Sequence, residues 1–133
     1  MGGIHPDALE TVAGDYRMDS GYEAAEMLLN GSKRKRPTAL MCANDLMAIG
    51  AMEYCRANGI CVPDDVSITG FDDIPIANLL TPRLTTASQP AYHMGRQAAD
   101  LLIKLIEGRA GYESPDPHPV NLVVRESSTK PEK

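Results

Sequence analysis

Apolar residues alternate along the chain between short continuous runs and stripes with helical spacing. Runs of strand length lie at residues 9–13, 38–43, 66–71, 84–88 and 120–124. Between them, apolar residues recur three and four positions apart, a spacing that predicts amphipathic helices. Strands that alternate with helices are typical of a parallel α/β sheet. We therefore predict an α/β fold, with a Rossmann-like parallel sheet and flanking helices.

The ends of the predicted helices carry recognisable signals. Ser20 and Glu23 form a capping-box pattern at the start of the first helix. Asn44 or Asp45 is expected to cap the second helix, and Pro90 suits the first turn of the third. The predicted helices span residues 20–30, 44–58 and 90–108.

Two further expectations concern burial and order. The run at residues 38–43 is continuously apolar, which predicts a strand that is covered on both faces. Residues 128–133 are polar and lie at the end of the chain, so we expect them to form a disordered tail. The chain is long enough for one domain and too short for two, so residues 1–127 are expected to form a single domain.

Three predicted strands end in polar or aromatic residues. The first run leads to Asp15 and Tyr16, the second to Asn44 and Asp45, and the third to Asp72 and Asp73. Because ligands bind beyond the carboxyl ends of parallel strands, these residues are expected to share one edge of the sheet. A carboxylate, an amide and an aromatic ring together suit a polar ring with hydroxyl groups, such as a sugar or a nucleoside.

Each of these residues also has a purely structural interpretation. Asn44 could simply cap a helix, and Asp72 and Asp73 could simply be turn residues. Either interpretation is about as good as ligand binding for one residue taken alone. Three strand ends with polar or aromatic residues on one edge of the sheet favour a ligand-binding site over these structural interpretations.

The net charge of −5 disfavours nucleic acid as a direct partner, because a DNA-binding surface is normally basic. The basic run at residues 33–36 is expected to be a solvated loop, with an anion patch as the alternative.

No apolar stretch reaches membrane-spanning length, and the first residues do not resemble a signal peptide. Cys42, Cys55 and Cys61 match no zinc or redox spacing and indicate structural thiols in a reducing cytoplasm.

The sequence gives little support for catalysis, a metal or a cofactor. Asp72 and Asp73 are adjacent, so their side chains diverge and cannot act as a facing acid/base pair. His5, His93 and His118 are scattered and have neither metal-ligand nor nucleophile spacing. There is no P-loop, dinucleotide fingerprint or nucleophile elbow. We predict no catalytic residue, no metal site and no cofactor.

Several ordered motifs resemble those of LacI/GalR-type transcriptional regulators. The resemblance covers residues 9–127, almost the whole chain. Its most specific parts are the Ala43-Asn44-Asp45 motif with the helix that follows it, and Gly70-Phe71-Asp72-Asp73. The other matching segments are residues 14–16, 20–22, 37–40, 62–69, 82–86, 89–90, 94–95 and 122–127.

The resemblance implies the C-terminal lobe of a two-lobed, periplasmic-binding-protein-like domain that holds a sugar or nucleobase-like effector between its lobes. By this resemblance Tyr16 stacks on the effector, Asn44 makes a polar contact and Asp72 binds its hydroxyl groups. The positions of Ile49, Leu79 and Leu80 match the family's dimer interface. The helix at residues 90–108 would pack on an N-terminal lobe that has no counterpart in this sequence, as the DNA-binding headpiece also has none.

The leading hypothesis is therefore the effector-binding and dimerisation part of a cytoplasmic LacI-type regulator. It would form a homodimer or larger assembly and contact DNA only through a headpiece outside this chain. The alternative is a fragment of an extracytoplasmic sugar-binding protein that serves a transporter. A small α/β enzyme is a third possibility, disfavoured by the lack of a nucleophile or a paired acid and base.

Overall fold

Four strands form one sheet in the computed structural model, which describes residues 9–31, 36–109 and 117–130. They pair in chain order, with the first three parallel and the last antiparallel. The strands are β1 (Ala39–Met41), β2 (Ser67–Asp72), β3 (Thr85–Ser88) and β4 (Asn121–Val123). The predicted α/β sheet with flanking helices is confirmed, and its parallel part is β1–β3.

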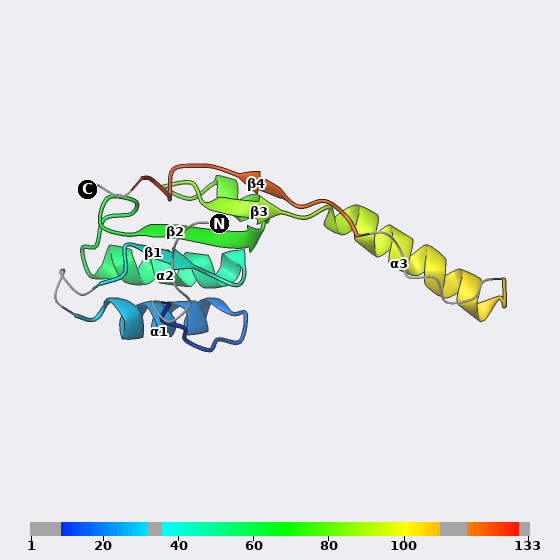
Figure 1. The fold of residues 1–133 in the computed structure, drawn as a ribbon, viewed down its shortest axis with the longest axis horizontal. Helices are drawn as coiled ribbons and strands as arrows, with labels where there is room; N and C mark the ends of the chain where they lie inside the picture. The colour runs from blue at the N-terminus through cyan, green and yellow to red at the C-terminus, as the bar shows by residue number, and fades with distance from the viewer. Residues whose placement is uncertain (1–8, 32–35, 110–116, 131–133) are drawn as a thin grey trace.

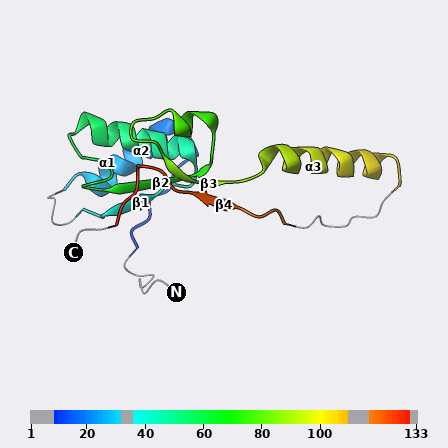
Figure 2. The same cartoon turned by 90° about the horizontal axis from the view of Figure 1, so that it is seen from above.

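The helices divide into a packed pair and an isolated one. Helices α1 (Met18–Leu29) and α2 (Asp45–Ala57) lie together on one side of the sheet (Figure 2). A short 3₁₀ segment, η3 (Pro75–Asn78), follows β2. Helix α3 (Ala91–Ile106) extends away from the sheet beyond the ends of β3 and β4 (Figure 1).

The hydrophobic core lies between the sheet and the α1–α2 pair. Its buried residues come from α1 and α2, from β1 and β2, from η3, and from the segments that follow α2 and η3. They are Ala25, Leu29, Leu40, Ala48, Ala51, Tyr54, Cys55, Ile60, Val66, Ile68, Ala77 and Leu84.

The other face of the sheet is largely open. The pairing register puts Ala39 and Met41 of β1 on the same face as Leu122 of β4. Met41 is 91% exposed and Leu122 is 70% exposed. The prediction that residues 38–43 form a strand covered on both faces is therefore wrong for one face. Both packed helices lie on the opposite side, against Leu40.

Two expectations at the start of the chain are also wrong. Residues 9–13 form no strand, because none of the described strands pairs with them and an extended segment needs a hydrogen-bonded neighbour. Ser20 does not cap α1, which begins two residues earlier at Met18. The Ser20 hydroxyl instead donates to the carbonyl of Arg17, the residue at the N-cap position, at 3.0 Å.

The end of the chain is tied to the sheet further than expected. Ser127 is fully buried and donates to the carbonyl of Ile68 at 2.6 Å. Ser128 and Thr85 share a hydrogen bond between their hydroxyl groups, and the backbone N–H of Thr129 donates to Ser67. The predicted tail at residues 128–133 is thus wrong for the first two residues, while residues 131–133 lie outside the described part.

Helices α1 and α2 approach each other through glycine. A Cβ atom at Gly21 would lie 2.1 Å from the carbonyl oxygen of Met47, and one at Gly50 would lie 2.0 Å from that of Met18. These neighbours are backbone atoms of the facing helix, which cannot move without moving the helix. Only glycine therefore allows this close packing.

We predict that Gly50→Ala separates the two helices and lowers the free energy of unfolding by about 1–3 kcal/mol, the usual cost of overpacking. Gly95 of α3 is the matched control, because a Cβ there meets nothing within 4 Å. Gly95→Ala should be neutral or stabilising by up to about 1 kcal/mol, since alanine favours helix. Urea unfolding of both variants measures the difference, and equal stabilities would contradict the tight crossing.

The three cysteines are free thiols in different surroundings. Burial raises the pKa of Cys42 to about 12, with a smaller contribution from Cys55. Burial also raises the pKa of Cys55 to about 11, opposed in part by the charge of Arg36. Cys61 is exposed. Because the thiolate is the reactive form, Cys42 and Cys55 have the character of structural thiols.

We predict a single fast-reacting thiol when the folded chain is mixed with Ellman's reagent at pH 8. A thiol of pKa about 11 is ionised to only about one part in a thousand at that pH, so Cys42 and Cys55 should react slowly and faster as the pH rises. Cys61→Ser should remove the fast phase. A fast phase that persists in that variant would show that Cys42 or Cys55 becomes exposed readily.

Candidate functional site

The predicted edge of the sheet brings Tyr16 and Asn44 together. The Asn44 side chain caps α2, accepting from the backbone N–H of Met47 at 2.9 Å, so its predicted role as a cap is confirmed. Its amide nitrogen also donates to the carbonyl of Tyr16, again at 2.9 Å. This contact, and not a preceding strand, positions Tyr16 beside the start of α2.

Tyr16 sits in a tight turn ahead of α1. Its φ is 67°, and the Asp15 carboxylate spans it by accepting from the backbone N–H of Arg17 at 3.0 Å. Hydrogen bonds from Ser20 and from Arg17 lower the pKa of the Asp15 carboxyl group. The Tyr16 side chain is 64% exposed, so the ring is available to cover an apolar surface of a ligand.

Asp72 and Asp73 form a second tight turn where β2 ends. Their φ values are 113° and 58°. The side chain of Gln89 donates to Asp72 Oδ1 at 2.6 Å. The guanidinium of Arg125 donates to Asp73 Oδ1 at 2.6 Å and to the carbonyl of Leu84 at 2.8 Å. Each carboxylate therefore has its own partner, and no described residue donates to Asp72 Oδ2.

Apart from glycines, left-handed backbone conformation in the described part of the chain occurs at these two turns. Among the described residues, Tyr16, Asp72 and Asp73 are the non-glycine residues with positive φ. Such conformations cost about 1–3 kcal/mol each and persist where surrounding contacts enforce them, commonly at ligand sites. Two of the three residues predicted to bind ligand are thus also two of the three strained ones.

A buried carboxylate links the two turns. Asp45 is fully buried and accepts from the backbone N–H of Ile74 at 2.8 Å and from the Thr86 hydroxyl at 2.5 Å. Ile74 directly follows the Asp72–Asp73 turn, while Asn44, the neighbour of Asp45, binds Tyr16. The structure therefore connects Tyr16 to Asp72. The Tyr16–Asn44 and Asp45–Ile74 contacts are hydrogen bonds, and the remaining steps run along the backbone.

Sequence reasoning placed Asp45 at this edge, as a strand end and a possible helix cap, but missed its contacts with Ile74 and Thr86. It also missed Gln89 and Arg125 as parts of this network. One signal was present for Asp45: Gly70 lies inside a strand, which often marks a close approach. A Cβ atom at Gly70 would lie 2.2 Å from Asp45 Oδ1. Nothing in the local pattern indicates the partners of Gln89 and Arg125, because their contacts span 17 and 52 residues.

The arrangement offers an exposed aromatic ring, an amide and a carboxylate with one free oxygen. The second N–H of Asn44 and Asp72 Oδ2 can bind hydroxyl groups, while the Tyr16 ring can lie against C–H groups.

Within the described ranges, no group of three or more His, Cys, Asp or Glu residues could hold a metal ion. His118 shares a hydrogen bond with Gln97, and His5 lies outside the described residues.

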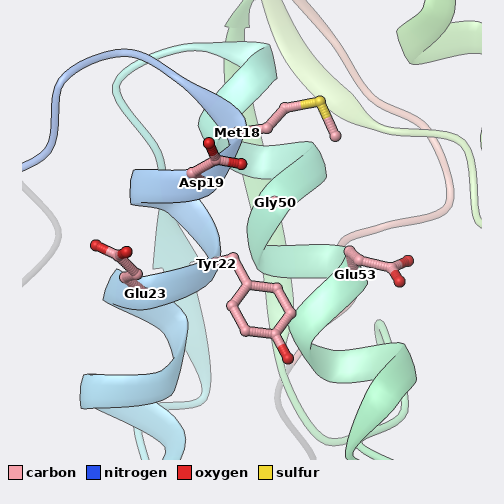
Figure 3. A pocket seen from close by; sticks show the side chains of 6 residues that line it. All are labelled: Met18, Asp19, Tyr22, Glu23, Gly50 and Glu53. Atoms are coloured by element: carbon pink, nitrogen blue, oxygen red, sulfur yellow. The ribbon is translucent and has the colours of Figure 1, made fainter.

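A shallow groove between α1 and α2 is separate from this edge (Figure 3). Met18, Tyr22 and Gly50 form its apolar part, and three carboxylates surround them. None of Tyr16, Asn44 and Asp72 lines it. Its acidic residues are Asp19, Glu23 and Glu53.

The three residues expected at a dimer interface differ in exposure. Leu79 is 79% exposed, whereas Ile49 is only 8% exposed in the single chain. Leu80 is partly buried and packs against the core. A partner chain could therefore contact Leu79 most fully. No helix in the described part of the chain is long and apolar enough to cross a membrane.

Comparisons with known proteins identify the family of this chain. A family model described as a periplasmic binding protein-like domain matches residues 2–128. The probable HTH-type transcriptional repressor ExuR of Bacillus subtilis is 46% identical over 96 residues, which are 72% of this chain and 28% of that protein.

Solved structures of LacI-type regulators have the same fold. One from Enterococcus faecium, with bound ribose, has a TM-score of 0.85 and 28% identity over 98% of this chain and 47% of its own. One from Lactobacillus casei, with bound sucrose, has a TM-score of 0.73 and 29% identity over 85% of this chain and 41% of its own. An extracytoplasmic sugar-binding protein is accordingly not favoured.

The chain spans less than a third of the curated relative's length and less than half of each solved chain. The match nevertheless covers nearly all of the present sequence. The chain belongs to the periplasmic-binding-protein-like domain family, in the form that constitutes the effector-binding domain of LacI-type transcriptional regulators.

Proposed function

We propose that this chain binds a sugar or nucleobase-like effector at the carboxyl edge of its sheet. Tyr16 would stack on the ligand, Asn44 would make a polar contact, and Asp72 would accept from neighbouring hydroxyl groups. Ribose and sucrose bound to two structural neighbours support a hydroxyl-rich ligand. In a full regulator the second lobe would close over the same edge.

The observation that carries this proposal is the strained geometry at the predicted ligand residues. Tyr16 and Asp72 both have left-handed φ values and are held there by hydrogen bonds. Stability alone does not favour a non-glycine residue in this conformation. Binding of a ligand by the Tyr16 and Asp72 side chains would explain why non-glycine residues occupy these left-handed positions.

The same contacts argue for binding without chemistry. Asp73 is paired with Arg125, and one oxygen of Asp72 is already occupied by Gln89. Neither carboxylate faces the other as a general acid faces a base. The relative from Bacillus subtilis is a probable transcriptional repressor. We infer that the chain is not an enzyme, that it acts in the cytoplasm, and that contact with DNA would require a headpiece outside this sequence.

The exposed helix α3 supports assembly with another apolar surface. None of its residues is buried in the single chain. Its exposed large apolar side chains include Met94, Leu102, Ile103, Leu105 and Ile106. In a complete regulator this stripe would pack on the other lobe. In this chain alone, a second copy is the proposed partner.

We predict that Asp72→Asn weakens effector binding at least tenfold, because hydrogen bonds to a charged group contribute about 1.5–3 kcal/mol. Asparagine tolerates the left-handed backbone at this position. Calorimetry with a panel of ribose, sucrose, adenosine and hypoxanthine first identifies a ligand and then compares the two proteins. Asp64→Asn, an exposed residue in the loop before β2, is the control.

The experiment distinguishes two failures. If a panel member binds and Asp72→Asn leaves its dissociation constant unchanged, Asp72 is not in the site. If no panel member binds either this chain or a longer form that includes the second lobe, the proposed ligand class is wrong.

We also predict that the isolated chain is a dimer or a larger assembly at micromolar concentration. Burying each large apolar side chain of α3 contributes about 1.5–3 kcal/mol, enough in total to drive association. Leu102→Glu combined with Leu105→Glu should shift the assembly toward monomer, whereas Lys104→Glu, one position away, should not. Light scattering after size exclusion measures the mass. A wild-type monomer would contradict this prediction.

A further inference from the structure

Two neighbouring residues at the start of α2 bind the two turns of the candidate site. Asn44 donates to the carbonyl of Tyr16 at 2.9 Å. Asp45 accepts from the N–H of Ile74 at 2.8 Å, at the end of the Asp72–Asp73 turn. The first turn of one helix therefore determines how far apart the aromatic ring and the carboxylate lie.

We propose that Asp45 is a positioning residue, which sets the Asp72–Asp73 turn against the Tyr16–Asn44 pair without contacting ligand itself. This inference rests on the proposed function, because it concerns the same site. Asp45 is fully buried beneath the edge of the sheet, so the exposed Tyr16 ring can meet a ligand while the Asp45 carboxylate cannot.

The surroundings of Asp45 are built for a carboxylate. One oxygen accepts from the Ile74 N–H and the other from the Thr86 hydroxyl, so both are satisfied although no solvent reaches them. Asp45 also lies in the first turn of α2, where the helix dipole favours a negative charge. Gly70 supplies the space, because a side chain there would collide with Asp45 Oδ1.

Stability alone does not account for this arrangement. A buried carboxylate is costly to desolvate, and well-packed apolar residues often give equal or greater stability at such positions. What an apolar residue cannot provide is a fixed acceptor for the Ile74 N–H. The turn before Ile74 contains two left-handed residues, and such a turn persists only where its contacts hold it in place.

Two other contacts complete the restraint on this turn. Arg125 holds Asp73 from the segment after β4, and Gln89 holds Asp72 from the segment after β3. Of Arg125, Gln89 and Asp45, only Asp45 reaches this turn from a helix of the α1–α2 pair. It is therefore the residue that positions the Asp72 turn relative to Tyr16.

The test compares Asp45→Asn with wild type by amide hydrogen exchange and NMR, without ligand. Asparagine preserves the shape but can present only one acceptor oxygen. We expect exchange at Ile74 to accelerate about tenfold and the side-chain amide resonances of Gln89 to move, as one hydrogen bond to a charged group is lost. Exchange at Ile68, which donates to the carbonyl of Ser127 in the middle of the sheet, should stay unchanged.

Asp65→Asn is the matched control. The Asp65 carboxylate also accepts from a backbone N–H, that of Cys61 at 2.9 Å, in a turn before β2. Its substitution should leave Ile74 and Gln89 as they are in wild type. If Asp45→Asn does not fold, Thr86→Val loosens the same carboxylate from its other side and should give the same selective change in smaller measure.

A uniform rise in exchange over Ile68 and Ile74, or no change at Ile74, would overturn the positioning role and leave Asp45 as a contributor to stability only. A titration with ribose forms a separate arm. If ribose binds wild type, Asp45→Asn should weaken it while Asp65→Asn does not, and equal affinity would again count against the proposal. If ribose does not bind, the ligand assignment is at fault, and the exchange result still decides the role of Asp45.

Discussion

The close crossing of α1 and α2 is the constraint on which the candidate site depends. Backbone atoms of one helix occupy the space that a side chain at Gly21 or Gly50 would need. This contact fixes the start of α1 against the start of α2, and Tyr16 and Asn44 stand at those two starts. The hydrogen bond between them is thus a result of how the helices pack, and not of a shared strand.

The two faces of the sheet differ in how they are packed. On the helix side, apolar packing and one buried carboxylate hold the strand ends in place. On the other side, Met41 and Leu122 remain exposed, and beyond the strand ends the apolar stripe of α3 is exposed as well. The chain therefore has a well-defined core on one side and exposed apolar surface elsewhere, which is the surface that the proposed second lobe or second copy would cover.

Much of the fold could be predicted from the pattern of residues, and so could the closeness of Tyr16 and Asn44 in the candidate site. Asn44 as a helix cap and the strands β2 to β4 follow from local chemistry. The strand proposed at residues 9–13 was wrong because an apolar run does not reveal whether a partner strand lies beside it. Ser20 was misassigned because the turn around Tyr16 is fixed by Asn44, 28 residues away. Arg125 and Gln89 were missed for the same reason, since their partners are remote in sequence.

The route by which the chain enters and leaves α3 has a mechanical consequence. Strands β3 and β4 are paired up to Ser88 and Asn121, so both connections to the helix emerge side by side. A helix of 16 residues is about 24 Å long, so a rotation of about 10° at its base carries the far end through about 4 Å. Gln89, bonded to Asp72, stands at that base. A small rotation beside Asp72, the carboxylate proposed to bind effector, would therefore become a movement of several ångströms at the far end of the helix.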